Sequence, residues 1–139
     1  MPQPDDPAHA VSQIIAQRIE ALYGQPLAEL EALADVPEST LLAALTGNHS
    51  AVVFAERNIA FQLERLRELT ASNREIGPFD AGHILDCARR LAESVATRDA
   101  YAKSTGAVLN GLRRATAPDT QPPPPPVPAA PTAAVSRTR

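Results

Sequence analysis

Tryptophan is missing from this 139-residue chain, aromatic residues make up only 4% of it, and Cys87 is its single cysteine. One cysteine excludes a disulfide within the chain and favours a reducing compartment. The lack of alternating β-branched and aromatic residues argues against β-strands. A chain of this length suffices for one domain with a modest core. We therefore expect leucine, isoleucine, valine and alanine in closely packed helices.

Long apolar runs and an excess of positive charge are also missing. The longest strongly apolar patch covers residues 51–55, whereas a membrane-spanning helix needs roughly 18–20 apolar residues. Residues 1–7 are acidic and rich in proline, unlike the basic start of a signal peptide. The formal charge of −3 gives no overall attraction to nucleic acid. We therefore expect a cytoplasmic protein that makes no contact with a membrane.

Signatures of catalysis and of metal binding are absent as well. The sequence has no glycine-rich phosphate loop and no Gly-x-Ser-x-Gly turn. Asp80, His83 and Cys87 fall on one helix face and are zinc-binding residue types, but no further ligands at a fixed spacing accompany them. We therefore expect a protein that is not an enzyme and that has no metal site and no cofactor.

Apolar residues at helical spacing are what the sequence does have. A stripe at steps of three and four residues predicts a helix over about 8–23, which Gly24 ends. Pro26 suits the first turn of a second short helix, because its missing N–H needs no partner there. A third short helix is expected over 37–45, with Gly47 as its C-terminal stop.

Two longer helices are expected in the second half of the chain. The first covers about 50–72, and Gly77-Pro78 separates it from the second, for which Asp80 is well placed as the N-terminal cap. The apolar stripe of the last helix is narrow, which predicts an antiparallel pair packed like a coiled coil. Its glycines predict fraying beyond about Thr105.

The sequence thus divides into three parts. Residues 1–7 are expected to be a disordered lead, residues 8–114 a single helical domain, and residues 115–139 a disordered tail rich in proline and alanine. The proline run 122–126 predicts polyproline II, either as a ligand for an aromatic groove or, as we favour, as a spacer or solubilising tail. The predicted fold class is all-α, with short helices of helix-turn-helix type before a long antiparallel helical hairpin.

Residues 27–47 resemble the helix-turn-helix of the Cro/C1 (Xre-like) repressors. Leu30, Ala34 and Val36 stand where that pattern has a buried aliphatic residue, a small residue before the turn and a buried valine after it. Thr40 and Leu41 stand at its usual Thr-Val positions. The resemblance implies a DNA-binding transcriptional regulator that forms a dimer through its long C-terminal helices. Its DNA contacts would be Ser39, Thr46, Asn48 and His49, with Arg57 for a phosphate.

This sequence departs from the pattern where DNA would be bound. Asp35 replaces the usual turn glycine, Glu31 replaces a small alanine, and the expected reading face lacks the cations that anchor phosphates. Residues 1–48 contain seven acidic residues and one arginine. A plainer interpretation is that 24–47 are two short helices of an α-bundle, the second beginning with a capping box at Asp35–Glu38.

Apolar residues surround the third expected helix on all sides, and others follow it closely. A helix without a polar side is either wholly buried or presents an apolar face to a partner. Our leading hypothesis is a non-enzymatic helical protein that binds a partner helix, or a second copy in a homodimer, through such a face. A regulator, antiactivator, adaptor, or small secretion or flagellar chaperone would have this build. The predicted face consists of Leu41, Leu42, Leu45, Val53, Phe54 and Phe61.

Overall fold

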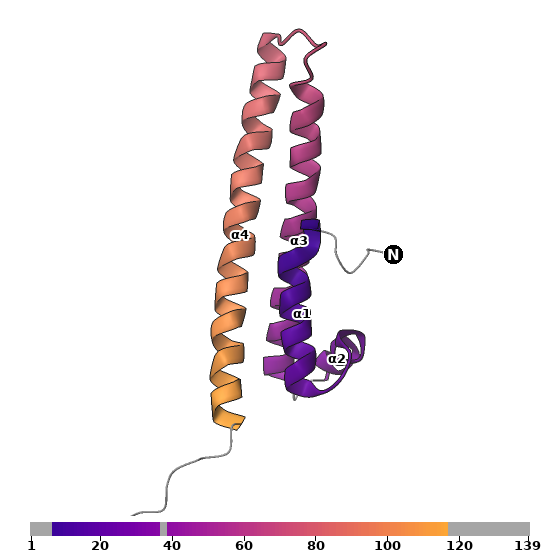
Figure 1. The fold of residues 1–139 in the computed structure, drawn as a ribbon, viewed down its shortest axis with the longest axis vertical. Helices are drawn as coiled ribbons and strands as arrows, with labels where there is room; N and C mark the ends of the chain where they lie inside the picture. The colour runs from indigo at the N-terminus through magenta and orange to yellow at the C-terminus, as the bar shows by residue number, and fades with distance from the viewer. Residues whose placement is uncertain (1–6, 37–38, 117–139) are drawn as a thin grey trace, which may run out of the picture.

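The computed structural model describes residues 7–36 and 39–116, and every regular element in this part of the chain is a helix. The elements are η1 (Pro7–His9, a 3-10 helix), α1 (Ala10–Tyr23), α2 (Leu27–Ala34), α3 (Thr40–Leu69) and α4 (Pro78–Thr116). The predicted all-α fold is confirmed (Figure 1). Expectations for the lead, for Pro37 and Glu38 and for the tail beyond α4 lie outside the described residues.

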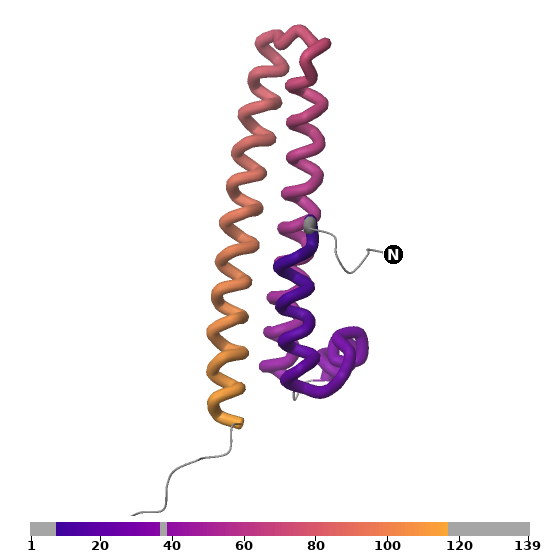
Figure 2. Tube along the Cα trace, in the orientation of Figure 1, coloured from indigo at the N-terminus to yellow at the C-terminus, as the bar shows by residue number. Residues whose placement is uncertain are grey.

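Helices α3 and α4 form a long antiparallel hairpin, as the sequence predicts (Figure 1). Helix α1 lies against both of them, but only along the half of the hairpin that is remote from the α3–α4 connection (Figure 2). That half is therefore a three-helix bundle, and α2 packs beside it against the start of α3. None of the helices in the described residues is long and apolar enough to cross a membrane.

The main core lies inside the three-helix half. Each of the four α-helices contributes to one cluster of buried apolar side chains, which consists of Ile15, Ile19, Leu30, Leu42, Leu45, Val52 and Leu109. At the far half of the hairpin only α3 and α4 are present, and apolar side chains there, such as Leu63 and Leu85, stay partly or largely exposed. Leu69 and Cys87 are nevertheless buried in the half without α1, so α1 adds to the burial that the two long helices give each other.

The turn between α1 and α2 follows from two local signals. Gly24 adopts a left-handed conformation (φ 70°), which ends α1, and its N–H donates to the carbonyl oxygen of Glu20. The carboxylate of Glu20 accepts the N–H of Leu27 at 2.8 Å, so that an acid of α1 satisfies a free donor at the start of α2. The prediction that Gly24 ends the first helix is confirmed.

The prediction of two helices separated at Gly47 is wrong, because α3 is one helix from Thr40 to Leu69. Leu45 and Val52 are buried on either side of Gly47, and seven residues is two helical turns, so both face the same core. A glycine inside a helix costs about 1 kcal/mol. Burying one leucine contributes about 1.5–3 kcal/mol. Packing on both sides therefore outweighs the helix-breaking tendency of the glycine.

Helix α4 differs from the prediction at both ends. It begins at Pro78, and Asp80 lies in its first turn, where its carboxylate accepts the N–H of Gly77 at 3.1 Å. That bond, together with Arg74, lowers the pKa of Asp80. The helix continues to Thr116 instead of fraying beyond Thr105, because Thr105 and Leu109 are buried against the bundle.

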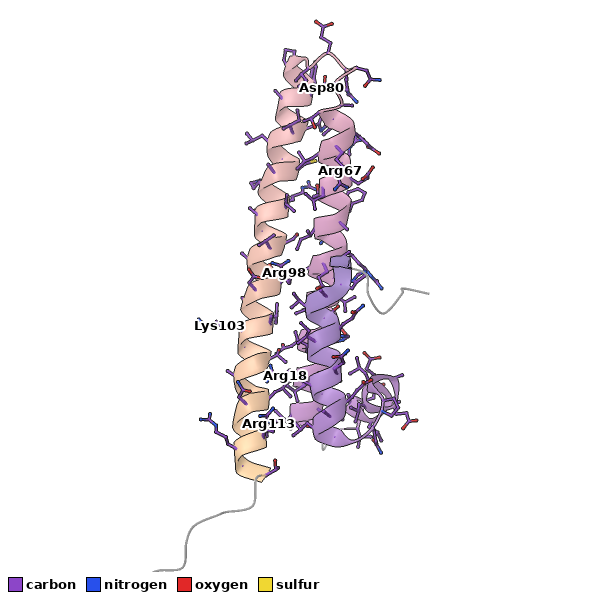
Figure 3. All side chains as sticks on the ribbon, viewed as in Figure 1. Arg18, Arg67, Asp80, Arg98, Lys103 and Arg113 are labelled. Atoms are coloured by element: carbon purple, nitrogen blue, oxygen red, sulfur yellow. The ribbon has the colours of Figure 1, made fainter. Side chains whose placement is uncertain are left out.

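Arg18 fastens α1 to the last turns of α4. Its guanidinium donates to the side-chain oxygen of Asn110 at 2.9 Å and to the carbonyl oxygen of Gly106 at 3.4 Å. Figure 3 shows Arg18 on α1 where that helix runs beside α4, with Arg113 farther along α4. This contact gives a second reason for the ordered end of α4.

Gly47→Ala is expected to raise the free energy of unfolding by about 0.5–1 kcal/mol, because Gly47 lies in a helix interior. An added Cβ would meet no atom within 4 Å at this position. Gly24→Ala is the matched control and should destabilise the protein, because Gly24 has a φ of 70°. Urea unfolding followed by circular dichroism measures both. A loss of stability in Gly47→Ala would contradict the continuous helix.

Candidate protein-binding face

The six residues predicted to bind a partner fall into two groups in the structure, one buried and one accessible. Leu42 and Leu45 are 7% and 1% exposed, so their assignment to a binding face is corrected: they belong to the core, where α1 and α2 cover them. Leu41, Phe54 and Phe61 are 44%, 66% and 64% exposed. Val53 is half-buried. Four of the six predicted side chains therefore remain accessible on α3.

These four residues do not form one surface. Leu41 precedes Phe54 by 13 residues, which turns it about 140° around the helix axis, so the two side chains point in different directions. Phe54 and Phe61 are seven residues apart, which places their Cα atoms about 10.5 Å apart on the same side of α3. We call the surface formed by Val53, Phe54, Arg57 and Phe61 the phenylalanine face.

An open depression lies beside the phenylalanine face, where α2 approaches α3. It has a volume of about 360 Å³ and is lined by Glu31, His49, Ser50, Val53, Phe54 and Arg57. Phe54 thus belongs both to the exposed face and to the wall of the depression. Glu31 comes from α2 and the other lining residues come from α3. The short helix therefore adds one acidic side chain to a depression that is otherwise formed by α3.

His49 is one of the residues that line this depression. Its Nδ1 atom is buried and has no hydrogen-bond partner in the structure. Burial lowers the pKa of His49, because the imidazolium loses solvation, while the carboxylates of Glu31 and Glu56 oppose this shift. The neutral imidazole is therefore favoured near neutral pH. The depression presents an uncharged ring beside Phe54 and not a second cation.

Arg57 is the cation of the phenylalanine face. It is exposed, it lies between the two phenylalanines along α3, and it has no ion pair among the described residues. The arginines farther along the helix differ, because Arg65 pairs with Glu68 and Arg67 pairs with Glu64. Arg57 therefore has guanidinium donors free to bind a group that approaches the two rings.

The residues expected to contact DNA are placed less favourably. The Thr46 hydroxyl is buried and donates to the carbonyl oxygens of Leu42 and Ala43 at 3.0 and 3.2 Å, so it is turned into its own helix. Three of the others, Ser39, Asn48 and His49, are half-buried, and only Arg57 is exposed. The predicted contacts are therefore not gathered on one accessible surface.

The turn before α3 matches the repressor pattern in part. Leu30 is buried, as the pattern requires, but Val36 is exposed where the pattern has a buried valine. Asp35 has right-handed helical angles (φ −72°, ψ −8°), and no residue other than glycine has a positive φ in the described part of the chain. Glu31 is exposed, so no carboxylate is buried at that position. Pro37 and Glu38, at the start of the helix expected over 37–45, lie outside the described residues.

The structure does not bring Asp80, His83 and Cys87 together as ligands of one metal ion. Asp80 pairs with Arg74, and Cys87 is buried as a free thiol between the two long helices. In residues 7–36 and 39–116, no group of three or more His, Cys, Asp and Glu side chains is arranged to hold a metal ion.

Glu56 is the important residue that the sequence analysis missed. It is 3% exposed, and its Oε1 atom accepts the N–H groups of Val11 and Ser12 at 2.9 and 3.2 Å. A carboxylate of α3 therefore caps the N-terminus of α1, which has no cap from its own side chains. Its Oε2 atom has no hydrogen bond and lies 3.4 Å from His9 Nδ1, an ion pair only when that imidazole is protonated.

No protein-family model, curated protein or solved structure matches the chain. The described residues themselves are therefore the basis for a function. On one side of α3 they bring together two exposed aromatic rings and an unpaired guanidinium, with a half-buried neutral imidazole beside them. Aromatic residues and arginine are the side chains most enriched where proteins bind other proteins.

Proposed function

We propose that this protein is a non-enzymatic interaction protein that binds a helical segment of another polypeptide on the phenylalanine face. The observation that carries the proposal is the pair Phe54 and Phe61, one heptad apart and each about two-thirds exposed. Helices bind other helices through apolar anchors that repeat every three, four or seven residues. Two rings in this register match one side of an amphipathic partner helix.

The surrounding residues define the chemistry of that partner. An acidic residue next to the partner's apolar stripe would pair with Arg57, which has no acid partner among the described residues. The depression beside Phe54, with Val53 and Phe54 on one part of its wall and polar side chains on the rest, has room for one side chain of the partner. Such a protein would act as a regulator, adaptor or chaperone, and its unpaired cysteine supports a place in the reducing cytoplasm.

The test replaces Phe54, Phe61 or Phe79, one at a time, by the photo-crosslinking amino acid p-benzoyl-phenylalanine in living cells. Phe79 is the matched control, because it is even more exposed (88%) but lies at the start of α4, at the other end of the hairpin. Positions 54 and 61 are expected to give adducts with another polypeptide, mapped by mass spectrometry to an amphipathic helical segment. Adducts with a second copy of this chain, or equal adducts from position 79, would contradict the proposal.

A further inference from the structure

A groove stays open along the half of the hairpin that α1 does not reach. A depression of about 500 Å³ lies where α1 begins, and its lining includes Val11 of α1, Ile59 and Leu63 of α3, and Arg98 of α4. Figure 3 shows Arg98 on α4 at the level where α1 starts, with Arg67 farther along α3 toward the connection. The groove between α3 and α4 that α1 occupies is therefore open beyond the first turn of α1.

Heptad spacing on α4 shows which side chains lie along this groove. A row of buried or half-buried side chains on α4 repeats every seven residues, at positions 84, 91, 98, 105 and 112. Residues seven apart therefore keep the same side of α4 toward their neighbours. Gly106 marks the side on which α1 lies, because a Cβ there would be 3.4 Å from the guanidinium of Arg18. Leu85 and Ala92 stand three and two heptads before Gly106, so they face the open continuation of the same groove.

Leu63 is the corresponding residue of α3. It stands seven residues after Glu56, whose carboxylate accepts N-terminal N–H groups of α1. Leu63 is 38% exposed, Leu85 is 72% exposed, and Ala92 is exposed as well. Both walls of the groove are thus apolar, and the alanine permits a close approach of another helix.

We propose that the same half of a second copy of this chain occupies the groove, so that two hairpins form a four-helix bundle over this part of their length. The contact continues an interface that the structure already contains, because α1 packs against α3 and α4 along the same groove in the other half. Each copy has the same open half, so a twofold axis covers both grooves in one contact. A bundle of four helices buries apolar stripes that a two-helix hairpin leaves in water.

The position of α1 fixes the direction of the second copy. In a parallel pair the two α1 helices would meet face to face and hold the open halves apart. In an antiparallel pair the open halves overlap, and the connected end of each hairpin points toward the start of α1 in the other copy (Figure 1). The overlap covers about the length from Glu56 to Leu69, 13 residues or about 20 Å. We therefore expect an antiparallel dimer.

The charged side chains at the groove favour contact between identical surfaces. Arg67 pairs with Glu64 at 3.1 Å and Arg98 pairs with Asp99 at 2.8 Å, in each case within the same helix. The remaining charged lining residue of the depression, Glu56, is buried and caps α1. The lining residues thus present no accessible unpaired charge that would repel a second copy or select a peptide of opposite charge.

This contact leaves the phenylalanine face uncovered. Phe61 and Leu63 are two residues apart, so their side chains point to opposite sides of α3. Phe79 precedes Ala92 by 13 residues, which turns its ring about 140° away around α4. The dimer therefore does not depend on the proposed function, and failure of one proposal is distinct from failure of the other.

Sedimentation equilibrium of the full chain tests the proposal. One chain has a mass of 14.8 kDa, and the native protein is expected to show twice this mass at micromolar concentrations. Leu85→Glu places a carboxylate from each copy in the apolar contact and should raise the Kd of the dimer about tenfold or more, as should Ala92→Glu. Leu41→Glu is the matched control, because Leu41 is also exposed but lies at the opposite end of the bundle, and its Kd should not change. Circular dichroism checks that the variants keep the helical fold.

A spin label at position 73, in the connection between α3 and α4, tests the antiparallel arrangement. In the full chain with Cys87→Ala and Asn73→Cys, pulsed electron–electron double resonance is expected to give a distance of about 20–30 Å between the two labels, from the overlap of the two hairpins. A much shorter distance would place the two connections side by side and contradict this arrangement. A monomer at all concentrations, or equal Kd values for Leu85→Glu and Leu41→Glu, would overturn the proposal.

Discussion

Leu45→Ala is expected to lower the free energy of unfolding by about 2–5 kcal/mol, the range for truncating a buried leucine. Leu45 is 1% exposed and packs with Ile15, Ile19 and Val52 in the cluster that joins α1 to the hairpin. The side-chain atoms removed by this substitution make packing contacts to two helices at once, and these contacts would be lost. Urea unfolding of the variant and of the native protein at the same pH measures the difference.

Leu41→Ala is the matched control, because Leu41 lies one turn earlier on the same helix and is 44% exposed. Its loss should be about 1 kcal/mol or less, in keeping with a surface position. Equal losses for Leu41 and Leu45 would contradict the burial that α1 and α2 impose. A small loss of unfolding free energy in Leu45→Ala would indicate that Leu45 lies on the accessible surface, as the apolar pattern of the sequence predicts.

Glu56→Ala is expected to lower the free energy of unfolding by about 1–3 kcal/mol and to loosen the first turn of α1. Two backbone N–H groups, of Val11 and Ser12, would lose their only side-chain acceptor, and Ser12 is buried away from water. Leaving buried donors unsatisfied costs about 1–3 kcal/mol. Hydrogen exchange should show faster exchange of these two amides, in addition to the shift in urea unfolding.

Glu56→Gln separates capping from charge. Its amide oxygen can still accept the two N–H groups, so most of the stability should be kept, apart from the interaction of a negative charge with the helix N-terminus. If alanine and glutamine variants lose the same amount, the hydrogen bonds to α1 are not the source of the effect. If neither loses stability, Glu56 does not hold α1 in place.

The local features of the fold could be predicted from the sequence because local chemistry decides them. Gly24 can adopt a positive φ at little steric cost, and it ends α1 as expected. Gly47 carries the same sequence signal, yet α3 passes through it, because buried leucine and valine on both sides hold one continuous helix against α1. The difference between the two glycines lies in tertiary packing, which the sequence pattern does not contain.

The candidate site could be predicted only in part for a similar reason. Helical periodicity shows that Phe54 and Phe61 share one side of α3, and they are indeed exposed there. Periodicity does not show which side another helix covers, so Leu42 and Leu45 were grouped with them although α1 and α2 bury both. Glu56 was missed because its partners, Val11 and Ser12, are more than 40 residues away in the chain.

The phenylalanine face is tested most directly by photo-crosslinking with benzoyl-phenylalanine at positions 54, 61 and 79. The measured quantity is the number of intermolecular adducts at positions 54 and 61 divided by the number at position 79. Binding of a partner helix predicts a ratio well above one, with adducts on a single amphipathic segment of another protein. Phe79 is the most exposed of the three rings, so random collisions would favour it. A ratio at or below one would contradict a binding role for Phe54 and Phe61.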